Sequence, residues 1–222
     1  MYDVMFKTPC TTIISGSSNG GKTVLTHNIL HNKDLLYNVL PKKTFLFYKK
    51  YQEIYDSMLK SGLVDELIEV EDEMVGEKEF EKLVSPYKND GGSLCVFDDC
   101  MELIDSTNSK IFTKIAHHEN CSIIFLTQSL FVDNKHYRVM SRNATYIIVM
   151  KNPRDVAQIK NLSIQMGVDK NLLVEAYKEA TKKAYSYLLL DFHPTTPDHI
   201  RLRSNILPGS SPMRVYLHKN SF

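Results

Sequence analysis

Apolar residues cluster in seven runs along the chain, and segments of mixed polarity separate these runs. Most of the runs are continuously apolar and rich in β-branched and aromatic residues, which is typical of strands that are buried on both faces. The pattern therefore predicts strands at residues 10–15, 43–49, 66–70, 93–97, 121–126, 144–150 and 185–192.

Helical patterns lie between these strands. They cover residues 22–31, 51–61, 77–84, 107–118, 154–165 and 169–182. Strands that alternate with helices predict βαβ units, and hence an α/β fold with a mostly parallel central sheet and helices on both faces. We expect one domain over residues 1–206 and a C-terminal arm or tail over residues 207–222, which carries Pro, Gly and Ser.

The composition and the net charge limit the classes of function that the chain can have. The 222 residues are 43% hydrophobic and 24% charged, as in an ordinary soluble globular protein, and the formal net charge is +1. Such a small charge gives no overall positive field, so contact with nucleic acid must come from a local patch, for example residues 133–138 or 179–185. No apolar run is long enough to cross a bilayer and the N-terminus lacks a signal-peptide pattern, so we expect an intracellular protein without a membrane segment.

Two groups of residues receive a structural interpretation. Cys10, Cys95 and Cys121 lie in or beside predicted strands, and no pair of cysteines has CxxC spacing. Buried free thiols in a reducing compartment are therefore favoured over disulfides or a metal site. The tyrosines from Tyr177 to Tyr187 are expected in the core or at its rim rather than stacked on bases.

The segment GSSNGGKT fits the phosphate-loop pattern GxxxxGK[ST], and it follows a predicted strand and precedes a predicted helix. Small residues let successive backbone N–H groups turn toward a phosphate, and the helix start adds its positive dipole end. Lys22 would reach the β- and γ-phosphates of ATP, and the Thr23 hydroxyl would hold Mg²⁺. The nucleotide-binding residues of this loop are Gly16, Ser17, Ser18, Asn19, Gly20, Gly21, Lys22 and Thr23.

Polar residues end two further strands. Asp98 and Asp99 follow the apolar run at 93–97, and Gln128 follows the run at 121–126. Open α/β sheets keep their chemistry at the carboxyl ends of strands. Asp98 is therefore predicted to hold Mg²⁺ together with Thr23, and Asp99 to orient or deprotonate the attacking water. Gln128 is predicted to hydrogen-bond the γ-phosphate or that water.

Three arginines are candidates for a finger that stabilises the γ-phosphate of a neighbouring subunit. Arg138 and Arg142 precede the predicted strand at 144–150, and Arg154 follows it. We favour Arg142, which we expect near the end of the sheet where the nucleotide sits. Each of the three is also compatible with an ordinary surface arginine.

Five segments in order carry a resemblance to a known family: the phosphate loop, VFDD, FLTQS, SRNATYIIVMKNPRD and YSYLLLDFHPTTPDHIRLRSNI. This series resembles the genome-packaging ATPases of the FtsK/HerA superfamily, in the poxvirus-type branch of large DNA viruses and Polinton (Maverick) elements. The resemblance extends from about residue 6 to residue 206, and IFTKIAHHENCSIIFLTQSLF adds to it. The interior of the loop departs from it, because Ser17, Ser18 and Asn19 stand where relatives often have Gly or Pro.

The resemblance implies a P-loop NTPase fold of the RecA and FtsK/HerA type. It implies an ATPase that translocates double-stranded DNA into a capsid, with ATP and Mg²⁺ as cofactors. By position, hydrolysis would fall to Lys22, Thr23, Asp98, Asp99 and Gln128, and the position of the family's arginine finger supports Arg142 without excluding Arg138. The implied partners are DNA, further copies of the chain in a ring, and a capsid or portal component of an assembling virion in an infected cell.

Two other functions remain compatible with a phosphate loop. A nucleotide or small-molecule kinase needs an acceptor pocket and usually an arginine-rich lid. Paired acids and a strand-end glutamine instead favour water as the acceptor. A non-catalytic nucleotide-binding scaffold is disfavoured because Lys22, Thr23, Asp98 and Asp99 are all present.

Overall fold

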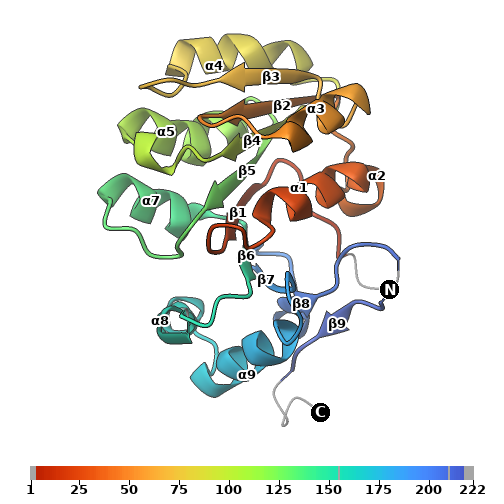
Figure 1. Cartoon of the computed structure of the whole chain (residues 1–222), viewed down its shortest axis with the longest axis vertical. Coiled ribbons are helices and arrows are strands. Elements are labelled where there is room, and N and C mark those ends of the chain that lie inside the picture. Colours follow the sequence, from red (N-terminus) through yellow and green to blue (C-terminus); the bar gives the residue numbers. More distant parts are fainter. Residues whose placement is uncertain (1–3, 155, 210, 218–222) are drawn as a thin grey trace.

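The computed structural model describes residues 4–154, 156–209 and 211–217, which fold around one twisted sheet (Figure 1). The strand order is β3-β2-β4-β5-β1-β6-β7-β8-β9. Strands β1 to β6 are parallel, whereas β7, β8 and β9 pair antiparallel. The strands are β1 (Thr11–Ser15), β2 (Lys43–Tyr48), β3 (Glu66–Glu69), β4 (Ser93–Asp98), β5 (Cys121–Thr127), β6 (Tyr146–Met150), β7 (Tyr187–Asp191), β8 (Leu202–Ser204) and β9 (Arg214–Val215).

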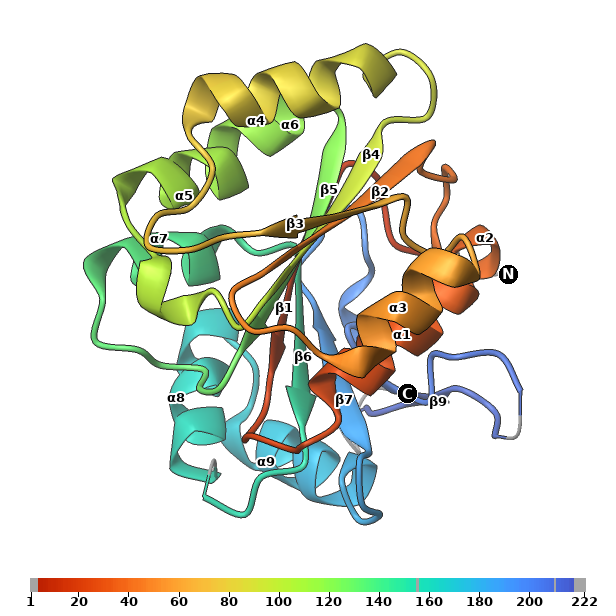
Figure 2. The ribbon, with the colours of Figure 1, turned by 45° about the horizontal axis from the view of Figure 1, so that its top comes forward.

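Helices cover both faces of the sheet (Figure 2). One face packs against α1 (Lys22–His31), α2 (Lys33–Leu36) and α3 (Glu53–Lys60). The other face packs against α4 (Glu77–Val84), α5 (Ser106–Lys110), α6 (Ala116–His118), α7 (Lys135–Asn143), α8 (Val156–Met166) and α9 (Lys170–Ala180). A π-helical turn at Ile111–Ile115 joins α5 to α6, and short 3-10 turns lie at Ser85–Tyr87, Met101–Leu103 and Asp198–Ile200.

The central strands bury side chains on both faces, because successive residues of a strand point to opposite sides. On β1, Ile13 belongs to the core under α4–α9, and Ile14 belongs to the core under α1–α3. On β4, Cys95 and Val96 divide between the two cores in the same way. Such strands need apolar residues at every position, and the predicted α/β fold with a mostly parallel sheet is confirmed.

The seven predicted strands and six predicted helices are all present, with boundaries shifted by a few residues. The helix predicted at 107–118 contains the π-helical turn described above. The prediction missed α2, α7, β8 and β9, which are short or mostly polar. In α7, for example, only Tyr137 and Met140 are buried, so its apolar stripe is too thin to recognise.

The predicted C-terminal arm is described over residues 207–209 and 211–217, and the remaining residues of the arm lie outside the described part of the chain. Within it, β9 pairs antiparallel with β8, so this part of the arm extends the sheet. All four cysteines are buried and free, as predicted. Among the described residues, no helix combines the length and apolar character needed to span a membrane.

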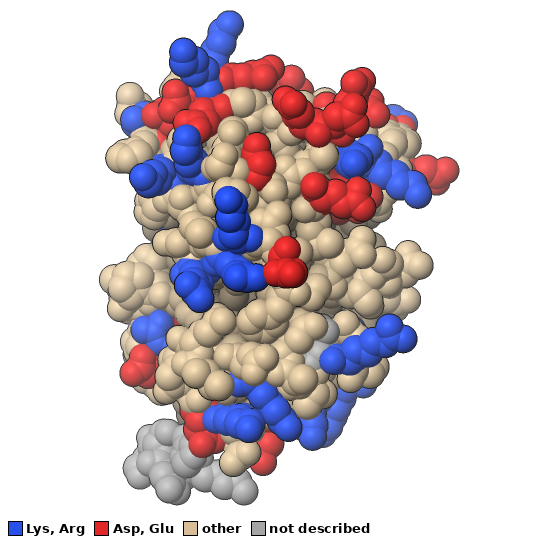
Figure 3. All heavy atoms as spheres, turned by 90° about the vertical axis from the view of Figure 1, so that its left-hand side faces the viewer, with Lys and Arg blue, Asp and Glu red and all other residues tan. Residues whose placement is uncertain are grey.

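Charge is unevenly distributed along the chain and over the surface. Residues 51–105 contain sixteen Asp and Glu but four Lys and Arg, whereas residues 106–222 contain sixteen Lys and Arg and eight Asp and Glu. In Figure 3, most of the acidic side chains gather at the end of the molecule that carries β3 and α4, and basic side chains prevail over the lower half. The small net charge therefore hides two regions of opposite sign.

A buried ion pair holds the antiparallel end of the sheet. Arg203 on β8 donates from Nη2 to Oδ2 of Asp191 on β7 over 2.7 Å, and both side chains are at most 2% exposed. The Thr196 hydroxyl donates to the same oxygen over 3.0 Å. Removal of one partner of such a pair leaves the other charge buried without compensation.

The variant Arg203→Ala should therefore lower the free energy of unfolding by about 3–5 kcal/mol, measured by denaturant titration. Arg214→Ala is the matched control, because Arg214 pairs with Glu179 at the solvent-exposed surface, and it should leave the midpoint nearly unchanged. Equal losses in the two variants would contradict a structural role for the buried pair.

Candidate active site

A cavity of about 900 Å³ opens at the carboxyl end of the parallel strands. Strand β5 lies between β1 and β4, so the residues that follow these three strands meet at one edge. The predicted residues that line the cavity are Ser18, Asn19, Gly20, Gly21, Lys22, Thr23, Asp98, Asp99 and Gln128. The volume lies in the range of small-molecule and cofactor sites.

The phosphate loop leaves β1 and wraps the start of α1. The Gly16 N–H donates to the Thr127 carbonyl over 3.1 Å, which ties the loop to β5. A Cβ atom on Gly16 would lie 2.7 Å from Cβ of Met150, so a larger residue cannot fit beside β6. Gly21 precedes α1 with φ +90°, a conformation that glycine adopts without strain.

The N-terminus of α1 is built to receive an anion. Gly21 offers no side chain to cap the first turn, and that turn contains no acidic residue. Its backbone N–H groups therefore lack a side-chain acceptor, and the positive end of the helix dipole points in the same direction. A phosphate group satisfies both features.

Lys22 bends back over its own loop. Its Nζ donates to the carbonyls of Gly16, over 2.8 Å, and Ser17, over 3.0 Å. Burial lowers the pKa of the Lys22 ammonium, and the nearby charges of Asp98 and Asp99 oppose that shift. A phosphate chain in the loop adds negative charge beside this ammonium and so stabilises its charged form.

Asp98 is the centre of a buried hydrogen-bond network. Its Oδ2 accepts from the Thr23 hydroxyl over 2.8 Å, from the Tyr55 hydroxyl over 2.9 Å and from Nε2 of Gln52 over 3.4 Å. Burial raises the pKa of Asp98, while the hydrogen bonds from Thr23 and Tyr55 and the charge of Lys22 lower it. These partners oppose the effect of burial and favour the ionised carboxylate.

Thr23 and Asp98 fit the Mg²⁺ that the phosphate loop implies. Their oxygen atoms are hard donors that lie 2.8 Å apart at the wall of the cavity. Mg²⁺ is typically held by one or two protein oxygens together with substrate phosphates and water. Thr23 and Asp98 would supply the protein's share, and the metal would neutralise charge on the phosphates.

Asp99 has a different environment from its neighbour. Its side chain is exposed in the cavity, and its backbone takes φ +57°, which is rare for a residue other than glycine. Strained backbone of this kind clusters at functional sites. Gln128 is also exposed and lines the same cavity. The structure thus brings together one buried and one exposed carboxylate and an amide.

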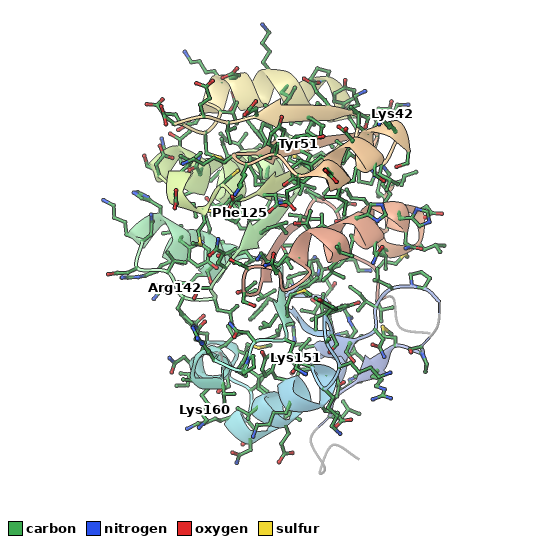
Figure 4. The ribbon with its side chains drawn as sticks, viewed as in Figure 1. Lys42, Tyr51, Phe125, Arg142, Lys151 and Lys160 are labelled. Carbon is green, nitrogen blue, oxygen red and sulfur yellow. The ribbon has the colours of Figure 1, made fainter. Side chains whose placement is uncertain are left out.

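Arg142 does not lie where we expected it. Arg142 lies in the last turn of α7, on the flank of the molecule (Figure 4), and the next residue, Asn143, accepts from the Thr11 hydroxyl at the start of β1. The phosphate loop leaves the other end of β1, about 13 Å away. The expected position of Arg142 near the nucleotide end of the sheet is therefore wrong, because Arg142 precedes β6, which is parallel to β1, and so lies at the amino ends of these strands. Arg154, in the loop after β6, lies at the edge of the sheet where the cavity opens.

Several residues of the site were missed from the sequence, and four of them lie on or before α3. Lys50, Tyr51 and Gln52 follow β2 and line the cavity, and Tyr55 reaches Asp98 from α3. These residues match no motif. The sequence indicates them only through their position after a strand that ends at the same edge of the sheet. Among the described residues the lining of the cavity includes two lysines, Lys22 and Lys50, and no arginine.

Comparisons with known proteins give matches among solved structures alone. No protein-family model and no curated protein matches the chain. Among solved structures, the chain is similar to the flagellar accessory protein FlaH from Methanocaldococcus jannaschii, with 14% sequence identity and a TM-score of 0.42. That similarity covers 64% of this chain and 71% of FlaH. The strand order and the loop between β1 and α1 give the chain the α/β fold of the P-loop NTPases.

Tyr55→Phe tests the network around Asp98. Loss of the Tyr55 hydrogen bond should raise the pKa of Asp98 further, because that bond favours the ionised carboxylate. Metal binding requires that carboxylate, so the loss of Mg²⁺-dependent ATP binding on acidification should begin at a higher pH than in the wild type. The measurement is the ATP dissociation constant in Mg²⁺ across a pH series. Tyr216→Phe, whose hydroxyl contacts Ser204 outside the site, is the control, and identical profiles for all three proteins would refute the expectation.

Proposed function

We propose that this protein is a Mg²⁺-dependent ATPase that assembles into a ring and translocates double-stranded DNA into a viral capsid. The observation that carries the ATPase assignment is the meeting of Lys22, the Thr23–Asp98 pair, Asp99 and Gln128 around one cavity. A phosphate site, a metal site and candidates to orient water are the parts that hydrolysis of a γ-phosphate needs.

The residues divide the reaction in a simple way. Lys22 moves from the loop carbonyls to the β- and γ-phosphates, and Thr23 and Asp98 would hold Mg²⁺. Asp99 accepts a hydrogen bond from a water molecule and takes its proton as the water attacks the γ-phosphorus. The bond from that phosphorus to the β–γ bridging oxygen breaks, ADP leaves with the bridging electrons, and inorganic phosphate forms. Gln128 donates a hydrogen bond to the γ-phosphate and so positions it.

Support for DNA as the partner comes from the motif series that resembles packaging ATPases and from the uneven charge. The acidic end at β3 and α4 would repel DNA, so the DNA surface is assigned to the region of α7, α8 and α9. Exposed cations there include Lys135, Arg142, Lys151, Arg154 and Lys160, of which three are labelled in Figure 4. Neutralisation of phosphates by such residues gives binding that does not depend on base sequence.

The same charge distribution supports a ring. An acidic end and a basic region on one chain suit a head-to-tail contact, in which the acidic end of one copy meets part of the basic region of the next and leaves the rest of that region to DNA. Contacts of that kind close into rings when the rotation between copies allows it. At such an interface, the neighbouring copy could place an arginine at a cavity whose own chain, over its described residues, lines it with none. The ring would then work with a capsid or portal component.

The experiment measures ATP turnover with and without double-stranded DNA. DNA should raise turnover, and Lys22→Ala should lower it by at least about 10²-fold, because the cation on the β- and γ-phosphates is lost. Lys33→Ala is the matched control, since burial also lowers the pKa of Lys33, but that side chain contacts Thr44 far from the loop. Near-normal ATP turnover in the Lys22→Ala variant would refute the ATPase proposal. Phosphate transfer to added nucleoside monophosphates would favour a kinase instead.

Mixing of variants tests the arginine finger. Arg142→Ala and Arg154→Ala should both bind ATP normally, and the chain that lacks the true finger should turn over about 10³-fold more slowly. Addition of Lys22→Ala chains should then restore part of the activity, because mixed interfaces pair an intact loop with an intact arginine. Arg138, which pairs with Asp133 over 2.6 Å, is the third candidate. Failure of every mixture to recover activity, in samples shown to co-assemble, would exclude a finger in trans.

A further inference from the structure

One aromatic side chain at the cavity has no part in the chemistry described above. Tyr185 lies in the turn between α9 and β7, lines the cavity and is 68% exposed. Its neighbours Tyr177 and Tyr187 are buried, at 3% and 8% exposed, as the sequence predicted for this group. Tyr185 lies outside the core, at the rim that the prediction also allowed, and it lines the cavity.

The ring of Tyr185 lies directly against the phosphate loop. A Cβ atom placed on Gly21 would be 3.0 Å from Cδ1 of Tyr185, so the loop and the ring are in close contact. Gly21 precedes the helix whose N-terminus offers its N–H groups to a phosphate. An aromatic face therefore lies immediately beside the phosphate site.

The turn that carries Tyr185 is fixed in place. The backbone of Tyr185 takes φ +59°, in the left-handed region that is unfavourable for a bulky side chain. Lys151, which directly follows β6, holds the turn with two hydrogen bonds. Its backbone N–H donates to the Ser186 carbonyl over 2.9 Å, and its Nζ donates to the Lys182 carbonyl over 2.8 Å. A strained conformation that is held by its surroundings is typical of a ligand-binding position.

The strand order shows which part of a nucleotide would meet this ring. Asp98 and Gln128 follow β4 and β5, which lie on one side of β1, whereas Tyr185 precedes β7 on the other side. A triphosphate in the loop that points its γ-phosphate toward Asp98 and Gln128 must run its α-phosphate, ribose and base in the opposite direction. The base therefore approaches the β6–β7 side, where Tyr185 lies.

Apolar atoms also line this end of the cavity. Leu207 is half-buried there, and the adjacent Ile206 donates its N–H to the Tyr187 hydroxyl over 3.2 Å, which fixes the segment against β7. An aromatic face and an aliphatic side chain together match the flat, apolar surface of a nucleobase.

We propose that Tyr185 is the platform on which the base of the bound nucleoside triphosphate stacks. The inference rests on the proposed nucleotide site and adds the subsite that holds the base. Stacking is tolerant of base identity because every base has a π-face. The subsite therefore raises affinity for nucleotides over free polyphosphates, and it does so similarly for ATP and GTP.

The test compares dissociation constants of ATP, GTP and inorganic tripolyphosphate in the presence of Mg²⁺. Tyr185→Ala should weaken ATP and GTP binding by about 5- to 150-fold, the range of base–aromatic stacking, and leave tripolyphosphate binding unchanged. Tyr185→Phe should bind all three as the wild type does. Tyr185→Gly removes the ring and also relieves the left-handed strain, so it separates the loss of stacking from poor folding.

The control is Tyr51→Ala. Tyr51 is 48% exposed and lines the same cavity from the loop after β2, on the other side of β1. This variant should change ATP and tripolyphosphate binding by equal factors, if at all. Unchanged ATP affinity in Tyr185→Ala, or an equal loss for ATP and tripolyphosphate, would overturn the base platform while leaving the ATPase proposal intact. A wild-type chain that binds neither ligand would instead overturn the nucleotide site itself.

A spectroscopic version is available because the chain contains no tryptophan. Tyr185→Trp introduces a single tryptophan at the proposed subsite, and a stacked base should quench the tryptophan emission on addition of ATP or GTP but not of tripolyphosphate. Tyr51→Trp should respond alike to ATP and tripolyphosphate. Equal responses of Tyr185→Trp to ATP and tripolyphosphate would show that the ring does not contact the base.

Discussion

The hydrogen bond from the Thr23 hydroxyl to the Asp98 carboxylate joins the two halves of the site. It connects the first turn of α1 to the end of β4 across the intervening strand β5. Since Asp98 is buried, its charge depends on this bond, on the Tyr55 hydroxyl and on Lys22. The protein thus holds together the oxygen atoms that a metal would share, and the neighbours of the carboxylate that would bind the metal favour its ionised form.

Neighbouring acids acquire different properties because the strand ends between them. Asp98 is the last residue of β4, and its buried carboxylate lies at the wall of the cavity, where the donors of Thr23 and Tyr55 compensate its charge. Asp99 turns out of the strand with a left-handed backbone and faces the cavity, where solvent reaches it. One carboxylate is therefore suited to a fixed metal and the other to a mobile water. Two adjacent residues therefore have different environments.

The central sheet could be predicted because strands buried on both faces must be apolar at every position, as Ile13 and Ile14 illustrate. The phosphate loop and the strand-end acids could be predicted because their residue types follow from the chemistry of a phosphate and a metal. Tyr55 and Tyr185 could not, because their roles depend on how α3 and the turn before β7 pack in three dimensions. Arg142 was placed at the wrong end of the sheet, because a residue that directly precedes a parallel strand lies at its amino end, whereas the phosphate loop follows β1 at the carboxyl end.

The central claim is that Asp98 and Asp99 hold separate roles in one nucleotide site, and ATP affinity in Mg²⁺ tests it most directly. The Asp98→Asn chain should lose the gain in ATP affinity that Mg²⁺ provides, because the buried metal ligand loses its charge. The Asp99→Asn chain should bind ATP as tightly as the wild type and fail to hydrolyse it, because the water loses its base. Equal losses of ATP affinity in the two variants would contradict the account.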